Sequence, residues 1–281
     1  MFELKETKDG FVNQVLDVLK DVLPKEWHAE YGERDGIPSV VLSDRKDRMM
    51  GVKVEQLKEY YSETESVSAV AEKIVELFGD AFSMVDGLNT FENAKDNIRF
   101  ALIHETHRHF NENMPYIAMD DLRLVYTVQV YVNNSTGNVF IDNKLMEEWG
   151  INADDLYNVA KNNGDLKTYQ MSNAFYGVSN NPNGYGAGGL WCDNAYETLS
   201  KKFDGRSFYV IPSSIHELIA IDEDIVDEST IRNLNISIPD INSDEEMVQK
   251  DEILSNKLYY FDMKTKKLMD AKEHYFSSML S

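Results

Sequence analysis

Two short segments of the sequence concentrate side chains that could do chemistry. The first, residues 212–217, reads Pro-Ser-Ser-Ile-His-Glu and brings hydroxyls, an imidazole and a carboxylate close together. A serine hydrolase needs its nucleophile and base to meet beside an oxyanion hole, and neighbours on one strand do not normally supply that geometry. The catalytic candidates are Ser213, Ser214, His216 and Glu217, and we expect them not to converge around one cleft.

His216 lies inside the run YVIPSSIHELIAI, which is apolar on both sides. A polar side chain in such a run is at least partly buried and costs free energy when it is left unpaired. We therefore expect a structural histidine whose ring contacts a carboxylate or a backbone group. Ser214 fits the same interpretation, because serine hydroxyls often bond to the backbone after proline.

The second segment, residues 104–109, holds three of the six histidines. Zinc proteases place two histidines at i and i+4 with a glutamate between them, and that spacing is absent here. On a helix, His104 and His107 at i and i+3 would offer two metal ligands. No third ligand is evident, and Arg108 opposes a cation. The pattern predicts a polar helix face without a bound metal, with His104 and His107 as the metal-ligand candidates.

Residues 184–189, GYGAGG, form a glycine-rich stretch. It lacks the Gly-Lys-Ser/Thr ending of a phosphate-binding loop, and it precedes a predicted strand where a phosphate cradle should follow one. Close backbone packing or a turn explains it better, so we expect no cofactor. Cys192 follows on the same predicted strand without a basic neighbour and is expected to be a small buried apolar group.

The chain is strongly acidic, with 49 Asp and Glu against 28 Lys and Arg and a formal net charge of −21. Such a surface repels phosphate backbones and anionic lipids, so direct nucleic-acid binding and membrane binding are disfavoured. The single cysteine excludes an internal disulfide framework and fits a reducing compartment. No signal-peptide pattern and no apolar run of the roughly 18 to 20 residues of a membrane helix is present. We expect a cytoplasmic protein.

Hydrophobic periodicity predicts alternating helices and strands along most of the chain. Gly79 is expected to end one helix, and Asn152 to cap the start of another. The predicted helices are residues 11–23, 54–63, 67–79, 104–113, 152–163, 194–203 and 272–280. The predicted strands are residues 27–34, 37–44, 97–103, 122–132, 139–141, 190–192, 207–212, 215–221 and 259–262. Residues 222–252 carry eleven acidic and two basic side chains and predict a solvated loop with a short helix.

The turn-forming residues 133–138, NNSTGN, mark the predicted domain boundary. The expected fold class is α+β, with two mixed α/β lobes whose short antiparallel or mixed sheets are flanked by helices. The N-terminal lobe would cover residues 1–134 and the C-terminal lobe residues 135–281. Strands 207–212 and 215–221 are expected to lie at the centre of the second lobe.

Several motifs follow one another in a recognisable order through the second half of the chain. They are Asp121-Leu122, Trp149-Gly150-Ile151, Asp155-Leu156-Tyr157 with Ala160, Met171, Tyr176-Gly177-Val178-Ser179-Asn180, Gly186-Ala187, Ile211-Pro212-Ser213-Ser214-Ile215-His216-Glu217-Leu218-Ile219, Leu254-Ser255 and Tyr259-Tyr260-Phe261-Asp262. Over residues 87–268 the chain resembles a family of unknown function that is common in anaerobic gut-type Gram-positive bacteria and their mobile elements. The Pro-Ser-Ser-Ile-His-Glu segment is its most specific part, and Gly188-Gly189 departs from the pattern. The resemblance implies a mixed α/β fold and no activity.

Three classes of function remain open. The leading hypothesis is a soluble non-catalytic binding or accessory protein that acts through protein–protein contacts, because no catalytic or cofactor motif is complete. The first alternative is an acidic nucleic-acid mimic that inhibits a host defence enzyme of the anti-restriction or anti-CRISPR type, which the charge of −21 suggests. The second is a hydrolase that uses residues 213–217. The expected partner is another protein, and its identity and the oligomeric state stay open.

Overall fold

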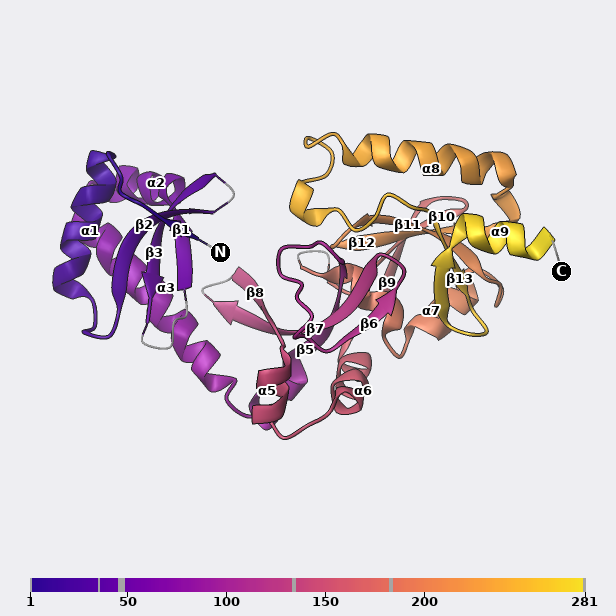
Figure 1. The fold of residues 1–281 in the computed structure, drawn as a ribbon, viewed down its shortest axis with the longest axis horizontal. Helices are drawn as coiled ribbons and strands as arrows, with labels where there is room; N and C mark the ends of the chain where they lie inside the picture. Colours follow the sequence, from indigo (N-terminus) through magenta and orange to yellow (C-terminus); the bar gives the residue numbers. More distant parts are fainter. Residues whose placement is uncertain (1, 35, 45–48, 133–134, 182–183, 280–281) are drawn as a thin grey trace. The chain divides into compact units, whose positions relative to one another are not determined.

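The computed structural model describes residues 2–34, 36–44, 49–132, 135–181 and 184–279. The chain divides into two compact units, residues 1–86 (unit 1) and residues 87–281 (unit 2). Helices combine with antiparallel sheets in both units, which confirms the α+β class (Figure 1). Within the described residues, no helix is long and apolar enough to cross a lipid bilayer.

Unit 1 is a four-stranded antiparallel sheet, in the order β1-β2-β3-β4, with helices that share its core. Its elements are β1 (Glu3–Leu4), α1 (Gly10–Val22), β2 (His28–Arg34), β3 (Ile37–Ser43), β4 (Met49–Lys53), α2 (Val54–Thr64) and α3 (Val67–Gly87). Alternate β3 residues Val40 and Leu42 join the apolar faces of all three helices in one buried cluster. Asp35 of the predicted tight turn lies outside the described residues, and its neighbour Gly36 has a φ of +76°, which favours glycine.

Gly79 does not end the third helix, as the sequence pattern had predicted. α3 continues to Gly87, because Phe78, Ala81 and Phe82 keep the helical spacing across the glycine and are all buried. A glycine inside a helix costs about 1 kcal/mol relative to alanine, and burial of two phenylalanine side chains outweighs that cost.

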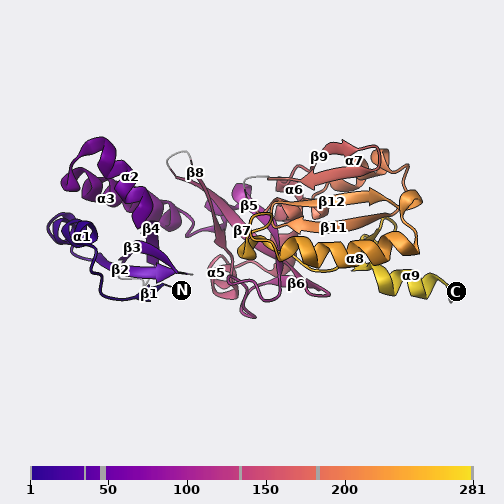
Figure 2. The same cartoon turned by 90° about the horizontal axis from the view of Figure 1, so that it is seen from above.

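Unit 2 contains a six-stranded and a four-stranded antiparallel sheet. The six-stranded sheet runs in the order β14-β13-β11-β12-β10-β9, so β11 (Phe208–Ser214) and β12 (Glu217–Asp222) are central, which confirms that prediction (Figure 2). Its other strands are β9 (Lys167–Ser172), β10 (Phe175–Ser179), β13 (Tyr259–Asp262) and β14 (Lys267–Asp270). The four-stranded sheet contains β5 (Ile98–His104), β6 (Tyr116–Met119), β7 (Leu122–Val132) and β8 (Ser135–Phe140).

Helices cover both faces of the six-stranded sheet. α8 (Glu228–Asn242) and α9 (Ala271–Met279) share a buried cluster with Tyr209 and Ile221 on one face (Figure 1). Leu199 of α7 and Phe203 belong to a larger core that also includes residues of the four-stranded sheet. The remaining helices are α4 (Phe91–Ala94), η1 (Lys95–Asn97), α5 (Asn143–Glu148), α6 (Ala153–Asn163), η2 (Gly186–Trp191), α7 (Ala195–Lys202), η3 (Glu223–Ile225) and η4 (Lys250–Glu252).

The compact units differ from the predicted lobes 1–134 and 135–281. Residues 135–138 of the predicted boundary belong to β8, which pairs with β7 from Thr127 opposite Phe140 to Val132 opposite Ser135. Residues 133 and 134 themselves lie outside the described part of the chain. Turn-forming composition marks a hairpin loop as readily as a linker between domains, which explains the misplaced boundary.

Three further element predictions were wrong. His104 ends β5 and residues 105–113 form successive turns, with His107 N–H donating to His104 O at 2.9 Å, because this segment has no apolar stripe to bury. Residues 190–192 belong to the end of η2 and the residue after it, not to a strand. The acidic segment contains the 15-residue helix α8, whose Ile231 and Ile238 are buried in the core, so the segment is not mainly a solvated loop.

Candidate functional site

Residues 250–257, which we call the strap, connect α8 to β13 and fasten parts of both sheets of unit 2. Ile215 N–H, in the turn after β11, donates to Glu252 O at 2.9 Å. Ser255 Oγ donates to Asp121 Oδ2 at 2.9 Å, beside β7. The Arg108 guanidinium pairs with the Asp251 carboxylate, which holds the turn that follows β5. The strap therefore contacts several segments that lie far apart in the sequence.

His216 contacts the strap through its ring. Its Nδ1 lies 2.6 Å from the Gly184 carbonyl oxygen, and its Nε2 lies 3.2 Å from Glu252 Oε1. The side chain is about two-thirds buried, with 33% of its surface exposed. One ring nitrogen thus contacts a backbone carbonyl and the other a carboxylate, as expected of a structural histidine.

The remaining members of the Pro-Ser-Ser-Ile-His-Glu segment do not form a catalytic set with this ring. Ser214 Oγ accepts a hydrogen bond from His216 N–H at 3.2 Å. Glu217 accepts a hydrogen bond from the Tyr169 hydroxyl, which raises the pKa of Tyr169 to about 12. Among the described residues, the Ser213 hydroxyl has no hydrogen-bond partner. Within the same part of the chain, no serine hydroxyl forms a hydrogen bond with the His216 ring. The hydrolase geometry is absent from the described segment.

Replacing His216 with alanine should lower the free energy of unfolding by about 1 to 3 kcal/mol, because the variant loses the contacts of the ring with the Gly184 carbonyl and with Glu252 of the strap. Urea denaturation of the full chain measures this. His28→Ala is the matched control, since His28 is exposed on β2. A His216→Ala variant that unfolds like the parent but loses partner binding would show that the ring serves a binding site instead.

His104 is the last residue of β5, and His107 lies in the turn after it; the Nδ1 atom of each ring accepts a hydrogen bond from a nearby backbone N–H. His104 Nδ1 accepts from Thr106 N–H at 3.1 Å, and His107 Nδ1 accepts from His109 N–H at 3.2 Å. His107 is buried, and this burial, with the nearby Arg108 charge, lowers its pKa. Among the described residues, no group of three or more His, Cys, Asp or Glu side chains is placed to hold a metal ion.

The residues that sequence reasoning missed centre on Asp121. The hydroxyls of Ser255 and Tyr259 both donate to its carboxylate, and His104 Nε2 lies 3.7 Å from Oδ2. Burial alone would raise the pKa of Asp121, but hydrogen bonds from these groups and the Lys257 charge outweigh burial and lower the pKa to about 2. Burial, followed by the contact with Asp121, raises the pKa of Tyr259.

The strap lines a cavity of about 470 Å³, which we call the strap cavity. Its walls come from the turn after β5, the start of β7 and the strap itself. The lining residues are His104, Thr106, His107, Arg108, Asp121, Lys250, Asp251, Ile253, Ser255, Asn256 and Lys257. Both predicted metal-ligand candidates therefore face one cavity with the Asp121 network, whereas Ser213, Ser214, His216 and Glu217 are not among its lining residues.

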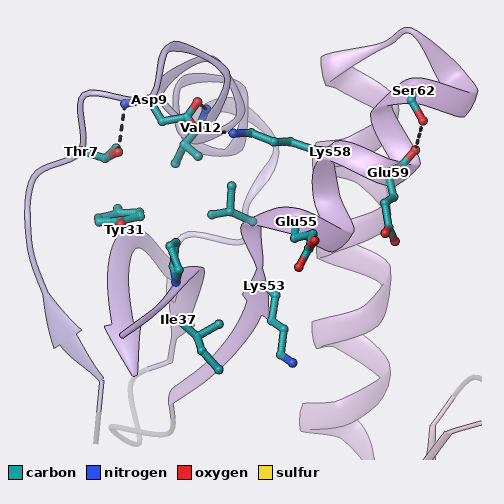
Figure 3. A pocket seen from close by; sticks show the side chains of 12 residues that line it. Thr7, Asp9, Val12, Tyr31, Ile37, Lys53, Glu55, Lys58, Glu59 and Ser62 are labelled. Atoms are coloured by element: carbon teal, nitrogen blue, oxygen red, sulfur yellow. Dashed lines mark hydrogen bonds and ion pairs between the residues drawn. The ribbon is translucent and has the colours of Figure 1, made fainter. Parts of the chain in front are cut away.

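Unit 1 carries a separate open groove of about 670 Å³, shown in Figure 3. Its apolar lining comes from Val12, Tyr31, Ile37, Pro38 and Val54, and its polar lining from Thr7, Asp9, Lys53, Glu55, Lys58, Glu59 and Ser62. The Lys58 ammonium of α2 pairs at 2.6 Å with Asp9, the N-cap of α1 (Figure 3). This hydrogen bond from Lys58 lowers the pKa of Asp9.

Charges that are not neutralised remain along this groove. Among the described residues, the carboxylates of Glu55 and Glu59 and the ammonium of Lys53 form no ion pair, whereas Asp9 and Lys58 neutralise each other. Ile37 exposes 42% of its surface at the same place. The groove thus offers apolar surface beside unpaired charge, with more free carboxylates than free ammonium groups.

The fold and both sites define a two-unit α+β protein with an open groove in unit 1 and a cavity lined by the strap in unit 2. Comparison with protein families matches residues 10–173 and 162–263 to a family of unknown function, DUF5688, and the chain belongs to this family. The match includes most of unit 1, beyond the region where the motifs showed the resemblance. No curated protein and no solved structure matches the chain.

Proposed function

We propose that the protein is a non-catalytic binding protein that acts through contact with another protein, and that the groove of unit 1 receives a segment of this partner. The single observation that carries the proposal is the open groove of about 670 Å³, which is lined by apolar side chains together with unpaired charges. Binding sites commonly combine an apolar lining with a few polar groups that orient the ligand.

Charge indicates the chemistry of the partner segment. Glu55 and Glu59 lie one helical turn apart on α2 and have no ion-pair partner among the described residues. The chain as a whole carries a net charge of −21, so a basic partner is attracted and an acidic one repelled. A segment that combines apolar side chains with lysine or arginine therefore complements this groove.

The two alternatives have less support from the contacts. The hydrolase hypothesis needs a serine next to a free imidazole, and the His216 ring contacts Gly184 and Glu252 instead. The nucleic-acid mimic needs a continuous row of carboxylates. Within α8, the long helix of the acidic segment, Glu228 and Asp240 are the acidic residues, and Glu228 is paired with Arg232.

The test is capture of a protein partner from the native host, followed by titration of the purified pair. Ile37→Asp should weaken binding by about a hundredfold, because it places a charge among the apolar side chains that line the groove. Ile236→Asp is the matched control, since Ile236 is an exposed isoleucine on α8. Glu59→Lys should weaken binding, whereas Glu63→Lys, one turn further along α2 and outside the groove lining, should not.

Equal binding by the Ile37→Asp variant and the parent would overturn the assignment of the groove. Turnover of an ester or peptide substrate by the purified protein, abolished by Ser214→Ala, would overturn the non-catalytic proposal and favour the hydrolase.

A further inference from the structure

We propose that the strap cavity of unit 2 is a second binding site, which takes a small molecule through an oxyanion, and that Lys250 recognises the charge of this oxyanion. This inference goes beyond the proposed function, because it concerns other residues in the other unit. It follows from the balance of charges in the cavity, from its hydrogen-bond donors and from its size.

The cavity is cationic in a chain that is otherwise acidic. Three permanently basic side chains line it, together with two carboxylates: Arg108, Lys250 and Lys257 against Asp121 and Asp251. The chain as a whole has 28 basic and 49 acidic side chains, so this local excess of cations reverses the overall balance. A local excess of one sign concentrates ligands of the opposite sign.

Both carboxylates of the cavity already have partners. Asp251 pairs with Arg108. Asp121 accepts from Ser255 and Tyr259 and lies 3.8 Å from the Lys257 ammonium. Acceptors that are already satisfied have little capacity to bind a further cation, so a metal ion or a ligand amine fits this site poorly.

Lys250 is the cation without a partner. It is exposed at the start of the strap, and no described residue accepts a hydrogen bond from its ammonium or pairs with it. Lys257, by contrast, is held by Asp120 at 2.5 Å. An ammonium at a cavity wall forms a charge-assisted hydrogen bond to an incoming phosphate or carboxylate, the stronger kind of hydrogen bond in proteins.

A neutral donor lies on the same walls. Asn256 Oδ1 accepts from Asn242, which leaves the Asn256 amide group to donate. A volume of about 470 Å³ is in the range of small-molecule sites. The ligand class is therefore a small phosphate or carboxylate compound, and a macromolecular polyanion is disfavoured by the net charge of −21.

The test is calorimetric titration of the full chain at low ionic strength with inorganic phosphate and, separately, with acetate. Lys250→Glu should weaken binding at least about tenfold, because it replaces the recognising cation with a repelling charge. Lys272→Glu is the matched control: it changes the net charge equally, but Lys272 lies in α9 and outside the lining. Both side chains are exposed, so neither substitution disturbs the core.

Saturable binding of either probe that Lys250→Glu removes and Lys272→Glu leaves supports the site, and the tighter probe identifies phosphate or carboxylate as the preferred group. The absence of saturable binding by both probes, or equal losses in the two variants, would overturn the proposal. Neither result depends on the groove of unit 1.

Discussion

Replacing Gly186 with alanine is expected to destabilise unit 2 by about 3 kcal/mol or more, the upper range for overpacking a filled site. A Cβ at this position would overlap Ser179 Oγ and the carbonyl oxygens of His216 and Asn181. Two of these three atoms belong to the backbone, which cannot rotate away as a flexible side chain does. The substitution also separates Ser179 Oγ from His216 O, which it bonds at 2.7 Å, and so disturbs the turn that carries His216.

The control for this prediction is Gly87→Ala. A Cβ on Gly87 meets nothing within 4 Å, and the residue ends α3. Its replacement should leave stability unchanged or raise it by up to about 1 kcal/mol, because alanine reduces the conformational entropy of the unfolded chain. Urea unfolding followed by tryptophan fluorescence compares the variants. If the Gly186→Ala variant unfolds at the same urea concentration as the parent, the backbone around this position can shift to make room for the added Cβ.

The glycine-rich stretch also shows what a single sequence can reveal. Its composition correctly predicted close backbone packing, and at Gly188 a Cβ would lie 2.6 Å from Phe100 O. The same composition could not name Phe100, because that strand lies far away in the sequence. Cys192 was likewise predicted as a buried group, and its burial raises the pKa of the thiol to about 11.

Elements whose signals are local were predicted well. The apolar, β-branched run at residues 122–132 coincides with β7, and Asn152 caps α6 in a capping box with Asp155. Each of these features depends on neighbours within a few positions, so one sequence contains the whole signal. The segment 104–113 was wrongly predicted as a helix although its turns are closed by local hydrogen bonds, because its polar composition offers no apolar stripe that a helix could bury.

The candidate sites were harder to predict, because their members are brought together only by the fold. Ser255 reaches Asp121 across 134 positions, and Tyr259 reaches it across 138. Each of these residues appeared in the motifs, but no spacing rule links an aspartate to a serine so far away. The unit 1 groove gave no signal at all in the sequence, because its lining comes from helices and strands that each have an ordinary amphipathic pattern.

Replacing Asp121 with alanine is expected to lower the free energy of unfolding by about 3 kcal/mol. The variant leaves the hydroxyls of Ser255 and Tyr259 without their shared acceptor, and both residues are only 1% exposed. Asp120→Asn is the matched control. It removes a neighbouring carboxylate whose side chain is 38% exposed. Asparagine, like aspartate, tolerates the positive φ of 54° at position 120. The substitution should therefore change the free energy of unfolding by less than about 1 kcal/mol.

The same carboxylate should contribute to the acid sensitivity of the protein. Its pKa falls from the ordinary 3.8 to about 2 on folding, so Asp121 stabilises the fold above about pH 4 and loses this contribution as the pH falls toward 2. Asp121→Asn keeps the shape of the side chain but cannot ionise. The difference in unfolding free energy between parent and Asp121→Asn should therefore be largest at neutral pH and shrink between about pH 4 and pH 2, as measured by urea unfolding in a series of buffers. A difference that stays constant across that interval would show that the charge of Asp121 is not what holds the strap.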